Sequence, residues 1–394
     1  MVSFLHAADV HLGIHMPRFG PDIARRIREA RFQSLDELLR HAQRLHVDFV
    51  VLAGDLFDDH AVDHLTARRA FEILSESPVP VYVIPGNHDP YLAGSVWDRQ
   101  PWNDPNRGNL HLLVQRQPVQ PKTGVVLFPC PLFQAKSRSD PTSWIKPEET
   151  NRTTIRIGIA HGSLNIRPNL PEDDHLIAAD AVTVRDLDYL ALGHWHRRQT
   201  FPDGQGVART AYSGVSEPMR FPDSAERTGW QPYSGTRDEF LDSGKGEALH
   251  VTIDRPKAIP RIEPVEIGRL IWQDEKHCLR SEQDLAGLIN DIARRDNPER
   301  RLLRLQLTGI LDAKAMLRLD ELHEIFNRYV FAELDRSSLY LQPDSEEIRQ
   351  SLGDGLLQRV WQKLQNDLQK ADTKGRRTAE RAILLMYQII QELH

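Results

Sequence analysis

The sequence holds little cysteine and no long apolar run, and each absence excludes a class of protein. Its two cysteines, Cys130 and Cys278, lie far apart among 394 residues and lack the paired spacing of a zinc or redox motif. We therefore expect reduced thiols and no disulfide framework. No stretch reaches the length of a membrane span, and the first residues lack the basic region and cleavage site of a signal peptide. These features predict a cytoplasmic protein without a membrane partner.

An excess of positive charge is also missing. The chain has 50 Lys and Arg residues against 56 Asp and Glu residues, a formal net charge of -6. Bulk charge therefore cannot hold it on a nucleic acid, and any polyanion must be bound by local features. With 40% hydrophobic and 27% charged residues, the composition is that of an ordinary globular protein. We find no solenoid-length repeat and no low-complexity tract.

The first two hundred residues alternate short apolar strands with helices. VSFLHAAD, DFVVLAGD and VPVYVIP each end in polar residues, and amphipathic helices are expected over residues 22–46 and 62–75. This alternation favours a sheet whose functional edge is the carboxyl end of its strands. Four more strand-like runs, HLLV, VVLFPCP, RIGIAHG and DYLALGHWH, follow with little helix between them. They predict a second sheet packed on the first, with flanking helices.

The rest of the chain changes in texture. Residues 201–258 are rich in Gly, Pro, Ser and Asp and are expected to form loops and hairpins around the site. In LLRLQLTG, leucines alternate with polar residues as in a half-buried strand, and two helices and a second strand lie nearby. We expect an α/β domain over residues 1–258, a small α+β capping domain over 259–343 and a helical segment over 344–394.

Five of the predicted strands end in nitrogen and oxygen donors, with no thiolate among them. The donors are Asp9, His11, Asp55 with Asp58, Asn87, His88 and Asp89, His161, and His194 with His196. Such a set suits Mn²⁺, Fe²⁺, Zn²⁺ or Mg²⁺. In D-x-H and H-x-H the two side chains of an extended segment share one face, so a pair can hold one ion or straddle two. Two ions sharing a carboxylate would polarise a phosphoryl oxygen and activate a water molecule.

The ordered motifs DVH, GDLFD, GNHD, AHG and GHWH resemble those of the calcineurin-like metallophosphoesterase superfamily. Together with the later YSG, they are similar to the DNA double-strand-break nucleases of the SbcD type, and to a smaller bacterial branch of YhaO-like proteins. The resemblance covers residues 1–220. The capping domain and the helical segment resemble those of the nuclease family in position alone.

The resemblance implies a role for each motif residue. One ion would be held by Asp9, His11, Asp55 and His196, and the other by Asp55, Asn87, His161 and His194, so that Asp55 bridges them. Both ions are expected to be Mn²⁺. His88 would face the scissile phosphate and protonate the leaving oxygen or stabilise its charge, with Asp58 as the carboxylate that orients its imidazole. Asp89 is expected to tie the turn together.

Arginines beside the motifs suggest a DNA substrate. Arg18, Arg25 and Arg26, with Arg28 and Arg31, follow the first motif, while Arg197 and Arg198, with Arg209 and Arg220, flank GHWH and YSG. They could contact a phosphate backbone. The alternative for the first group is a solvated helix face.

The hypothesis is therefore a Mn²⁺-dependent DNA phosphodiester hydrolase acting in double-strand-break repair. The alternative is a stand-alone phosphodiesterase for small nucleotides. The resemblance further implies docking of the helical segment on an SMC-like coiled-coil ABC ATPase of the SbcC type, and a homodimer is a second partner hypothesis. The alternative for the helical segment is a hairpin that covers the capping domain.

Overall fold

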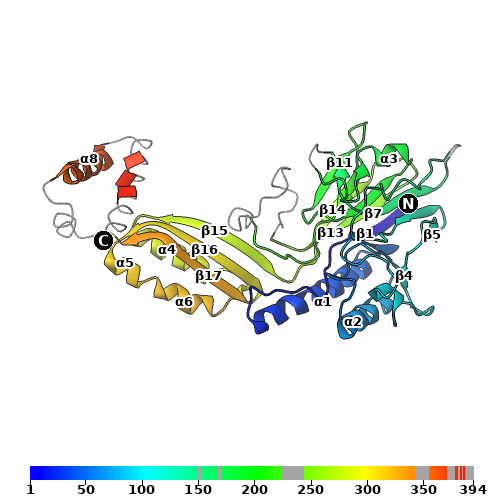
Figure 1. The fold of residues 1–394 in the computed structure, drawn as a ribbon, viewed down its shortest axis with the longest axis horizontal. Coiled ribbons are helices and arrows are strands. Elements are labelled where there is room, and N and C mark those ends of the chain that lie inside the picture. The colour runs from blue at the N-terminus through cyan, green and yellow to red at the C-terminus, as the bar shows by residue number, and fades with distance from the viewer. Residues whose placement is uncertain are drawn as a thin grey trace. The chain divides into compact units, whose positions relative to one another are not determined.

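The computed structural model describes residues 1–148, 152–166, 170–222, 244–341 and 355–370, with short helical pieces at 378–379, 382–383 and 385–386. The chain divides into two compact units, Met1–Gln273 and Asp274–His394. Figure 1 shows their elements in order along the chain. Among the described residues, no helix has the length and apolar character needed to cross a membrane.

The first sheet of unit 1 has six strands in the order β14-β13-β1-β2-β3-β4. Neighbours among β1 to β4 are parallel, so their carboxyl ends share one edge. The strands are β1 (Val2–Ala7), β2 (Phe49–Ala53), β3 (Val81–Ile84), β4 (Leu110–Leu112), β13 (Glu247–Ile253) and β14 (Arg261–Glu266). β13 runs antiparallel to β1, and β14 runs antiparallel to β13.

The second sheet also has six strands, in the order β11-β12-β10-β7-β6-β5. Its four central strands are parallel, and the outer two pair antiparallel. The strands are β5 (Val119–Lys122), β6 (Val125–Cys130), β7 (Ile155–His161), β10 (Tyr189–Gly193), β11 (Gln199–Pro202) and β12 (Ala208–Tyr212). Shorter pieces are η1 (Val96–Asp98), β8 (Leu164–Asn165), β9 (Ile177–Ala178) and α3 (Ala181–Val184).

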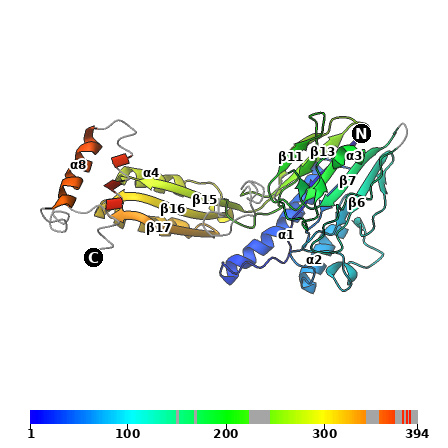
Figure 2. The same ribbon diagram turned by 45° about the horizontal axis from the view of Figure 1, so that its top comes forward.

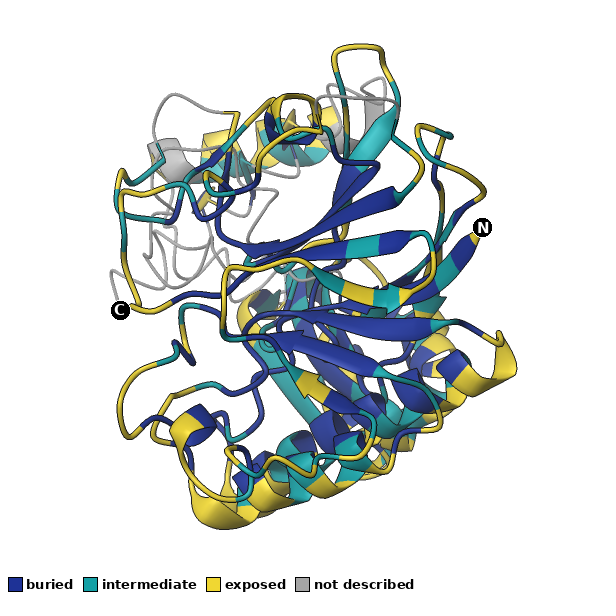
Figure 3. Ribbon diagram, turned by 90° about the vertical axis from the view of Figure 1, so that its right-hand side faces the viewer, coloured by how far each residue is buried: buried dark blue, intermediate teal, exposed yellow. Residues whose placement is uncertain are grey.

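The two sheets pack face to face because their central strands are apolar on both sides. Val51 of β2, Ile159 of β7 and Tyr189 of β10 belong to one buried cluster between the sheets. On the outer face of the first sheet, α1 (Pro21–Arg44) and α2 (His64–Ser75) bury their apolar stripes in a second cluster. Figure 3 shows these layers, with exposed residues on the outer sides of the helices. The predicted two-sheet sandwich with flanking helices is confirmed.

Unit 2 is built on a three-stranded sheet, β15-β16-β17, whose first strand begins just before the unit boundary, with helices between its strands. The elements are β15 (Ile271–Leu279), α4 (Glu282–Ala293), η3 (Pro298–Arg300), β16 (Arg301–Leu311), α5 (Ala313–Leu317), α6 (Asp320–Phe326) and β17 (Phe331–Leu341). Leu303, Leu305 and Leu307 are fully buried and pack against α4, as their alternation predicts. Figure 2 shows α4 beside these strands. β15 is not predicted by the sequence because its polar residues, in WQDEKHC, hide the strand pattern.

The boundary expected after residue 258 differs from the structure. β14 pairs with β13, so the first sheet continues to Glu266 and unit 1 extends to Gln273. In the C-terminal segment, α8 (Leu356–Lys370) forms where the first amphipathic helix is expected. Most of the second expected helix lies outside the described residues. Its Met386 packs against Trp361 and Leu364 of α8, a contact that favours the hairpin alternative.

Candidate active site

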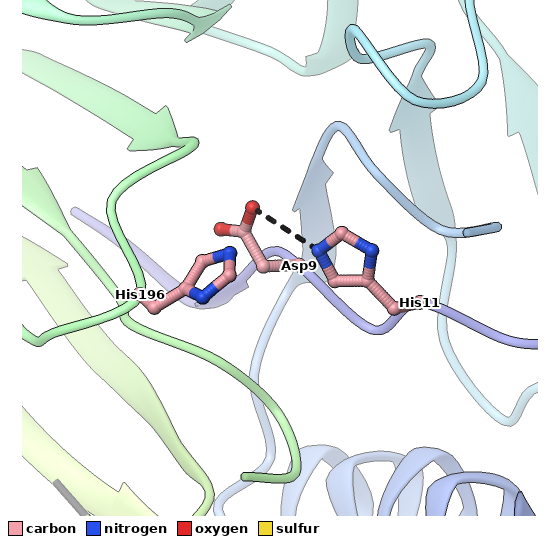
Figure 4. Close-up of side chains that lie close together, drawn as sticks. All are labelled: Asp9, His11 and His196. Carbon is pink, nitrogen blue, oxygen red and sulfur yellow. Dashed lines mark ion pairs between the residues drawn. The ribbon is translucent and has the colours of Figure 1, made fainter. Parts of the chain in front are cut away.

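The candidate ligands meet where the carboxyl ends of the two sheets face each other. Asp9, His11, Asp55 and Asn87 follow β1, β2 and β3, while His161 ends β7 and His194 and His196 follow β10. Figure 4 shows Asp9 and His11 on one segment with His196 opposite them. Ligand atoms of Asp9, His11 and His196 lie within 4.8 Å of one another, as do those of Asp9, Asp55 and His161. Residues 187 positions apart in sequence thus share one site.

The backbone at these positions is strained. Asp9, His11 and Asp55 have φ values of 53°, 50° and 52°, and His194 has 108°, all in the left-handed region that non-glycine residues rarely adopt. Main-chain hydrogen bonds hold this geometry, including those from the Asp9 and His11 amides to the carbonyls of Gly54 and Asp55. Gly54 itself leaves room for the site, because a Cβ there would lie 2.3 Å from Nδ1 of His161. Strain of this kind persists where surrounding structure enforces it, as at functional sites.

The first donor group comprises Asp9, His11, Asp55 and His196. Nδ1 of His11 lies 3.1 Å from Oδ1 of Asp58, which places the imidazole proton on Nδ1. The remaining nitrogen, Nε2, is buried without a hydrogen-bond partner among the described residues. It lies 4.0 Å from the Asp9 carboxylate and 3.9 Å from that of Asp55. A lone pair facing two carboxylates is an unfavourable arrangement that a cation would satisfy.

The second donor group comprises Asp55, Asn87, His161 and His194. Nδ1 of His161 lies 2.8 Å from the Ala53 carbonyl, which leaves its Nε2 as an acceptor. That Nε2 is 2.8 Å from Oδ1 of Asn87 and 3.2 Å from Oδ2 of Asp55. Nδ1 of His194 approaches the same Asn87 oxygen at 2.9 Å. Acceptor atoms therefore converge from both sheets, and Asp55 lies between the two groups. These residues fit a pair of cations, with nitrogen and oxygen donors that suit several divalent metals.

Without a cation, the buried carboxylates of Asp9 and Asp55 lie close enough to repel each other. Burial and the neighbouring Asp55 carboxylate raise the pKa of Asp9 well above its ordinary value. Burial also acts to raise the pKa of Asp55, but positive charge on the adjacent His161 and His11, when these rings are protonated, outweighs it and holds that pKa below its ordinary value. Burial lowers the pKa of His11 to about 4. Burial and Asp55 thus oppose ionisation of Asp9, and a positive ion bound beside it would favour the ionised carboxylate.

His88 differs from the other donors, which are buried or half-buried, because its side chain is exposed. Its backbone N–H donates to Oδ1 of Asp55 at 2.9 Å, and its Nδ1 lies 2.9 Å from the backbone carbonyl of Asp58. With Nδ1 held there, Nε2 is the nitrogen that can meet a substrate. The Asp58 carboxylate bonds to His11 and its carbonyl to His88, so that orientation of His88 by the carboxylate stays a prediction.

Asp89 fastens the turn, as the sequence predicts. Its buried carboxylate accepts hydrogen bonds from the backbone N–H of Gly86 at 2.6 Å and of Phe57 at 2.9 Å. One side chain therefore links the GNHD turn to the GDLFD loop. The same two loops supply Asn87, His88 and Asp55, so their relative position depends on this link.

The arginines expected to bind substrate separate into two kinds. Arg18, Arg25, Arg26, Arg197 and Arg198 are exposed on the surface of unit 1. Arg18 lies over the ring of Phe221 at 5.7 Å. Arg25 is 3.7 Å from Asp22, and Arg198 is 3.1 Å from Glu247. Exposed pairs of this kind are weak and can exchange for a phosphate.

Two other arginines, Arg31 and Arg209, have structural contacts instead. Arg31 is fully buried and donates to the carbonyls of Val10, at 2.7 Å, and Pro218, at 3.1 Å. It therefore supports the loop between Asp9 and His11. Arg209 pairs with Asp203 and donates to the carbonyl of Asp188, before the first residue of β10 and hence at the end opposite His194.

Comparison with known proteins agrees with this geometry. Residues 2–198 match the family model of the calcineurin-like phosphoesterases, and the chain belongs to that family. It is a hydrolase of phosphoester bonds, with a cluster of Asp and His residues that could bind metal. The predicted superfamily is confirmed.

Individual relatives are more distant. The chain is 33% identical over 215 residues to the "Uncharacterized metallophosphoesterase YhaO" of Bacillus subtilis, covering 50% of this chain and 49% of that protein. It is 28% identical over 274 residues to the "DNA double-strand break repair protein Mre11" of Methanocaldococcus jannaschii, covering 68% and 67%. Among solved structures, TT1561 of Thermus thermophilus has a TM-score of 0.41 at 12% identity, covering 68% of this chain and 99% of that one. The match thus spans about half the length of YhaO and two thirds of Mre11.

Proposed function

We propose that this chain is a Mn²⁺-dependent DNA phosphodiester hydrolase that acts in double-strand-break repair. The observation that carries the proposal is the exposed His88 beside two donor groups that are buried or half-buried, with exposed arginines following both His11 and His196. A polyanionic chain could then be held by its phosphates on either side of the reacting group. Similarity to archaeal double-strand-break repair proteins supports DNA as the substrate.

The residues divide the chemistry between them. Two divalent cations, when bound by the two donor groups, would polarise the phosphoryl group and supply an activated water molecule. The Asp58 carboxylate and the Ala53 carbonyl hold the Nδ1 protons of His11 and His161. The Nε2 lone pair of each ring can therefore bind a cation. His88 then protonates the leaving oxygen through Nε2 while the Asp58 carbonyl holds its Nδ1–H.

Partners are part of the same proposal. An SMC-like coiled-coil ABC ATPase of the SbcC type would dock on the helical segment beyond unit 2's sheet, and two copies of the chain would pair as a homodimer. The amphipathic stripe of α8, with Val360 40% exposed, offers apolar surface to such a partner.

The substrate is tested by comparing phosphodiesters under one set of conditions. With Mn²⁺, the full chain should cleave linear duplex DNA, and chelation should abolish the activity. Cyclic dinucleotides, single strands and a chromogenic phosphodiester complete the panel, and an Asp55→Asn variant controls for contaminating nucleases. Faster turnover of cyclic dinucleotides, with duplex DNA left intact, would replace the nuclease by the small-nucleotide phosphodiesterase.

Binding of DNA should depend steeply on salt despite the negative net charge. Replacing Arg25, Arg26 and Arg28 by glutamine should flatten the slope of log affinity against log salt by about one per lost phosphate contact. Fluorescence anisotropy of a labelled duplex with Ca²⁺ in place of Mn²⁺ measures this slope.

The matched control removes the same charge elsewhere on the first sheet's helices, at Arg40, Arg44 and Arg68. These residues are exposed, and Arg40 and Arg68 pair with Glu37 and Glu72. Equal slopes for both triple variants would make the start of α1 an ordinary solvated face.

A further inference from the structure

A carboxylate that lies outside every motif contacts the second donor group. Asp174 belongs to the loop between β8 and β9, and both of its oxygens lie 3.2 Å from Nε2 of His194. Its side chain is 25% exposed. The opposite ring nitrogen of His194 is the one that approaches Asn87. Asp174 and Asn87 thus lie at opposite nitrogens of one imidazole.

Buried groups hold the Asp174 carboxylate in turn. The hydroxyl of Ser163 donates to Oδ2 of Asp174 at 2.5 Å, and the indole N–H of Trp195 donates to that hydroxyl oxygen at 3.0 Å. Ser163 and Trp195 are both fully buried. Trp195 is the residue between His194 and His196, so this chain of hydrogen bonds begins and ends within the GHWH motif. The loop position of Asp174 is fixed further by the hydrogen bond from the Ser163 amide to its carbonyl.

We propose that Asp174 is a positioning residue for the second donor group, acting through the imidazole of His194. By accepting Nε2–H, the carboxylate places the ring proton away from the cluster and leaves the Nδ1 lone pair facing Asn87 and His161. It also makes the imidazole a stronger donor, as carboxylates behind metal-bound histidines do. The inference rests on the proposed two-cation centre but not on DNA as the substrate.

Metal binding by the full chain tests the proposal. Wild-type apoprotein titrated with Mn²⁺ should bind two ions and give the exchange-coupled electron paramagnetic resonance signal of a bridged pair. Asp174→Ala should weaken binding of the second ion by about 10- to 100-fold and leave binding of the first unchanged. The coupled signal should then appear only at a higher Mn²⁺ concentration than in the wild type. Asp174→Asn should be intermediate, because its amide oxygen can still accept Nε2–H without a charge. The melting temperature of each apoprotein is measured alongside.

The neighbouring Asp173 provides the matched control. Its carboxylate is 43% exposed and lies 3.3 Å from the exposed Lys136, so Asp173→Asn should bind both ions with wild-type affinity. A double-mutant cycle with His194→Ala then measures whether the effect of Asp174 on Mn²⁺ affinity is transmitted through His194. If Asp174 acts through His194, removing it from the His194→Ala protein should cost no further Mn²⁺ affinity.

Wild-type affinities for both ions in Asp174→Ala would overturn the proposal. Equal weakening of both ions, together with a lower apoprotein melting temperature, would also overturn it by showing a merely structural role. Wild-type binding of a single ion would remove the centre on which the inference rests. If the double-mutant cycle behaves as described but the protein fails to cleave DNA, the positioning role of Asp174 stands and only the nuclease function is rejected.

Discussion

Replacing His88 by alanine is expected to lower turnover by about 10²- to 10⁴-fold, the range for a positioned proton donor, while both metals stay bound. The physical reason is the separation of roles in the structure. The exposed imidazole contributes no atom to either donor group, whereas its backbone N–H, which alanine keeps, donates to Asp55. Steady-state hydrolysis of duplex DNA and metal analysis of the same preparation measure the two effects.

Two further variants make this expectation specific. Asp58→Asn should act differently from His88→Ala, because the Asp58 carboxylate supports His11 while its carbonyl supports His88. It should weaken metal binding, and excess Mn²⁺ should restore part of its turnover. His323→Ala removes an imidazole that is 60% exposed on unit 2 and should leave activity unchanged. Loss of metal from His88→Ala would make it a ligand, and near-full activity would remove its role as the acid.

Removing metal should destabilise unit 1 at neutral pH, and Asp9→Asn should reverse that loss. The folded pKa of Asp9 is raised by burial and by Asp55, so the stability that its protonated form provides is complete below the unfolded pKa of about 4 and is lost as pH rises through the folded pKa. Asp55, with its pKa held low, acts in the opposite direction but only below pH 4. Above pH 4 the contribution of Asp9 should therefore be lost as pH rises, so the stability of the wild-type apoprotein should fall relative to that of the Asp9→Asn apoprotein.

Thermal unfolding with and without Mn²⁺ checks this expectation. At a free concentration one hundred times the dissociation constant, an ion adds about 2.7 kcal/mol, which raises the melting temperature of a domain this size by about 5 to 11 °C. In Asp9→Asn, the apoprotein should melt higher than wild type at pH 7, and Mn²⁺ should raise it far less.

Asp22→Asn is the control, since that carboxylate is 94% exposed and lies 3.7 Å from the exposed Arg25. A lower melting temperature for the Asp9→Asn apoprotein would show that the native hydrogen bonds from the His194 amide to Asp9 outweigh charge repulsion.

Site residues could be predicted from the sequence where they directly follow a strand with a clear apolar pattern. Parallel strands bring their carboxyl ends to one edge, so polar residues after VSFLHAAD, DFVVLAGD and DYLALGHWH could be predicted to meet. Asp174 could not be found in this way because it lies in PEDDHLI, which ends no long strand. Its position depends on a two-residue pairing of β8 with β9 and on the buried Ser163.

The roles of Asp58 and Arg31 were hidden for a related reason. Sequence spacing places Asp58 near both His11 and His88 but cannot tell which imidazole its carboxylate contacts. In the sequence, Arg31 resembles the exposed arginines earlier in the same helix. Its position around the helix axis turns it toward the protein interior, where it donates to the Val10 carbonyl. Which face of α1 meets the first motif is decided by tertiary packing.

The division of ligands between two sheets bears on how the chain is made. Asp9, His11, Asp55 and Asn87 come from the first sheet, but each donor group is completed only by histidines after residue 155. A nascent chain that has left the ribosome only as far as β6 therefore carries an incomplete set of ligands for either ion. Hydrolytic competence would arise in one late step of synthesis, when β7 and β10 dock against strands made much earlier.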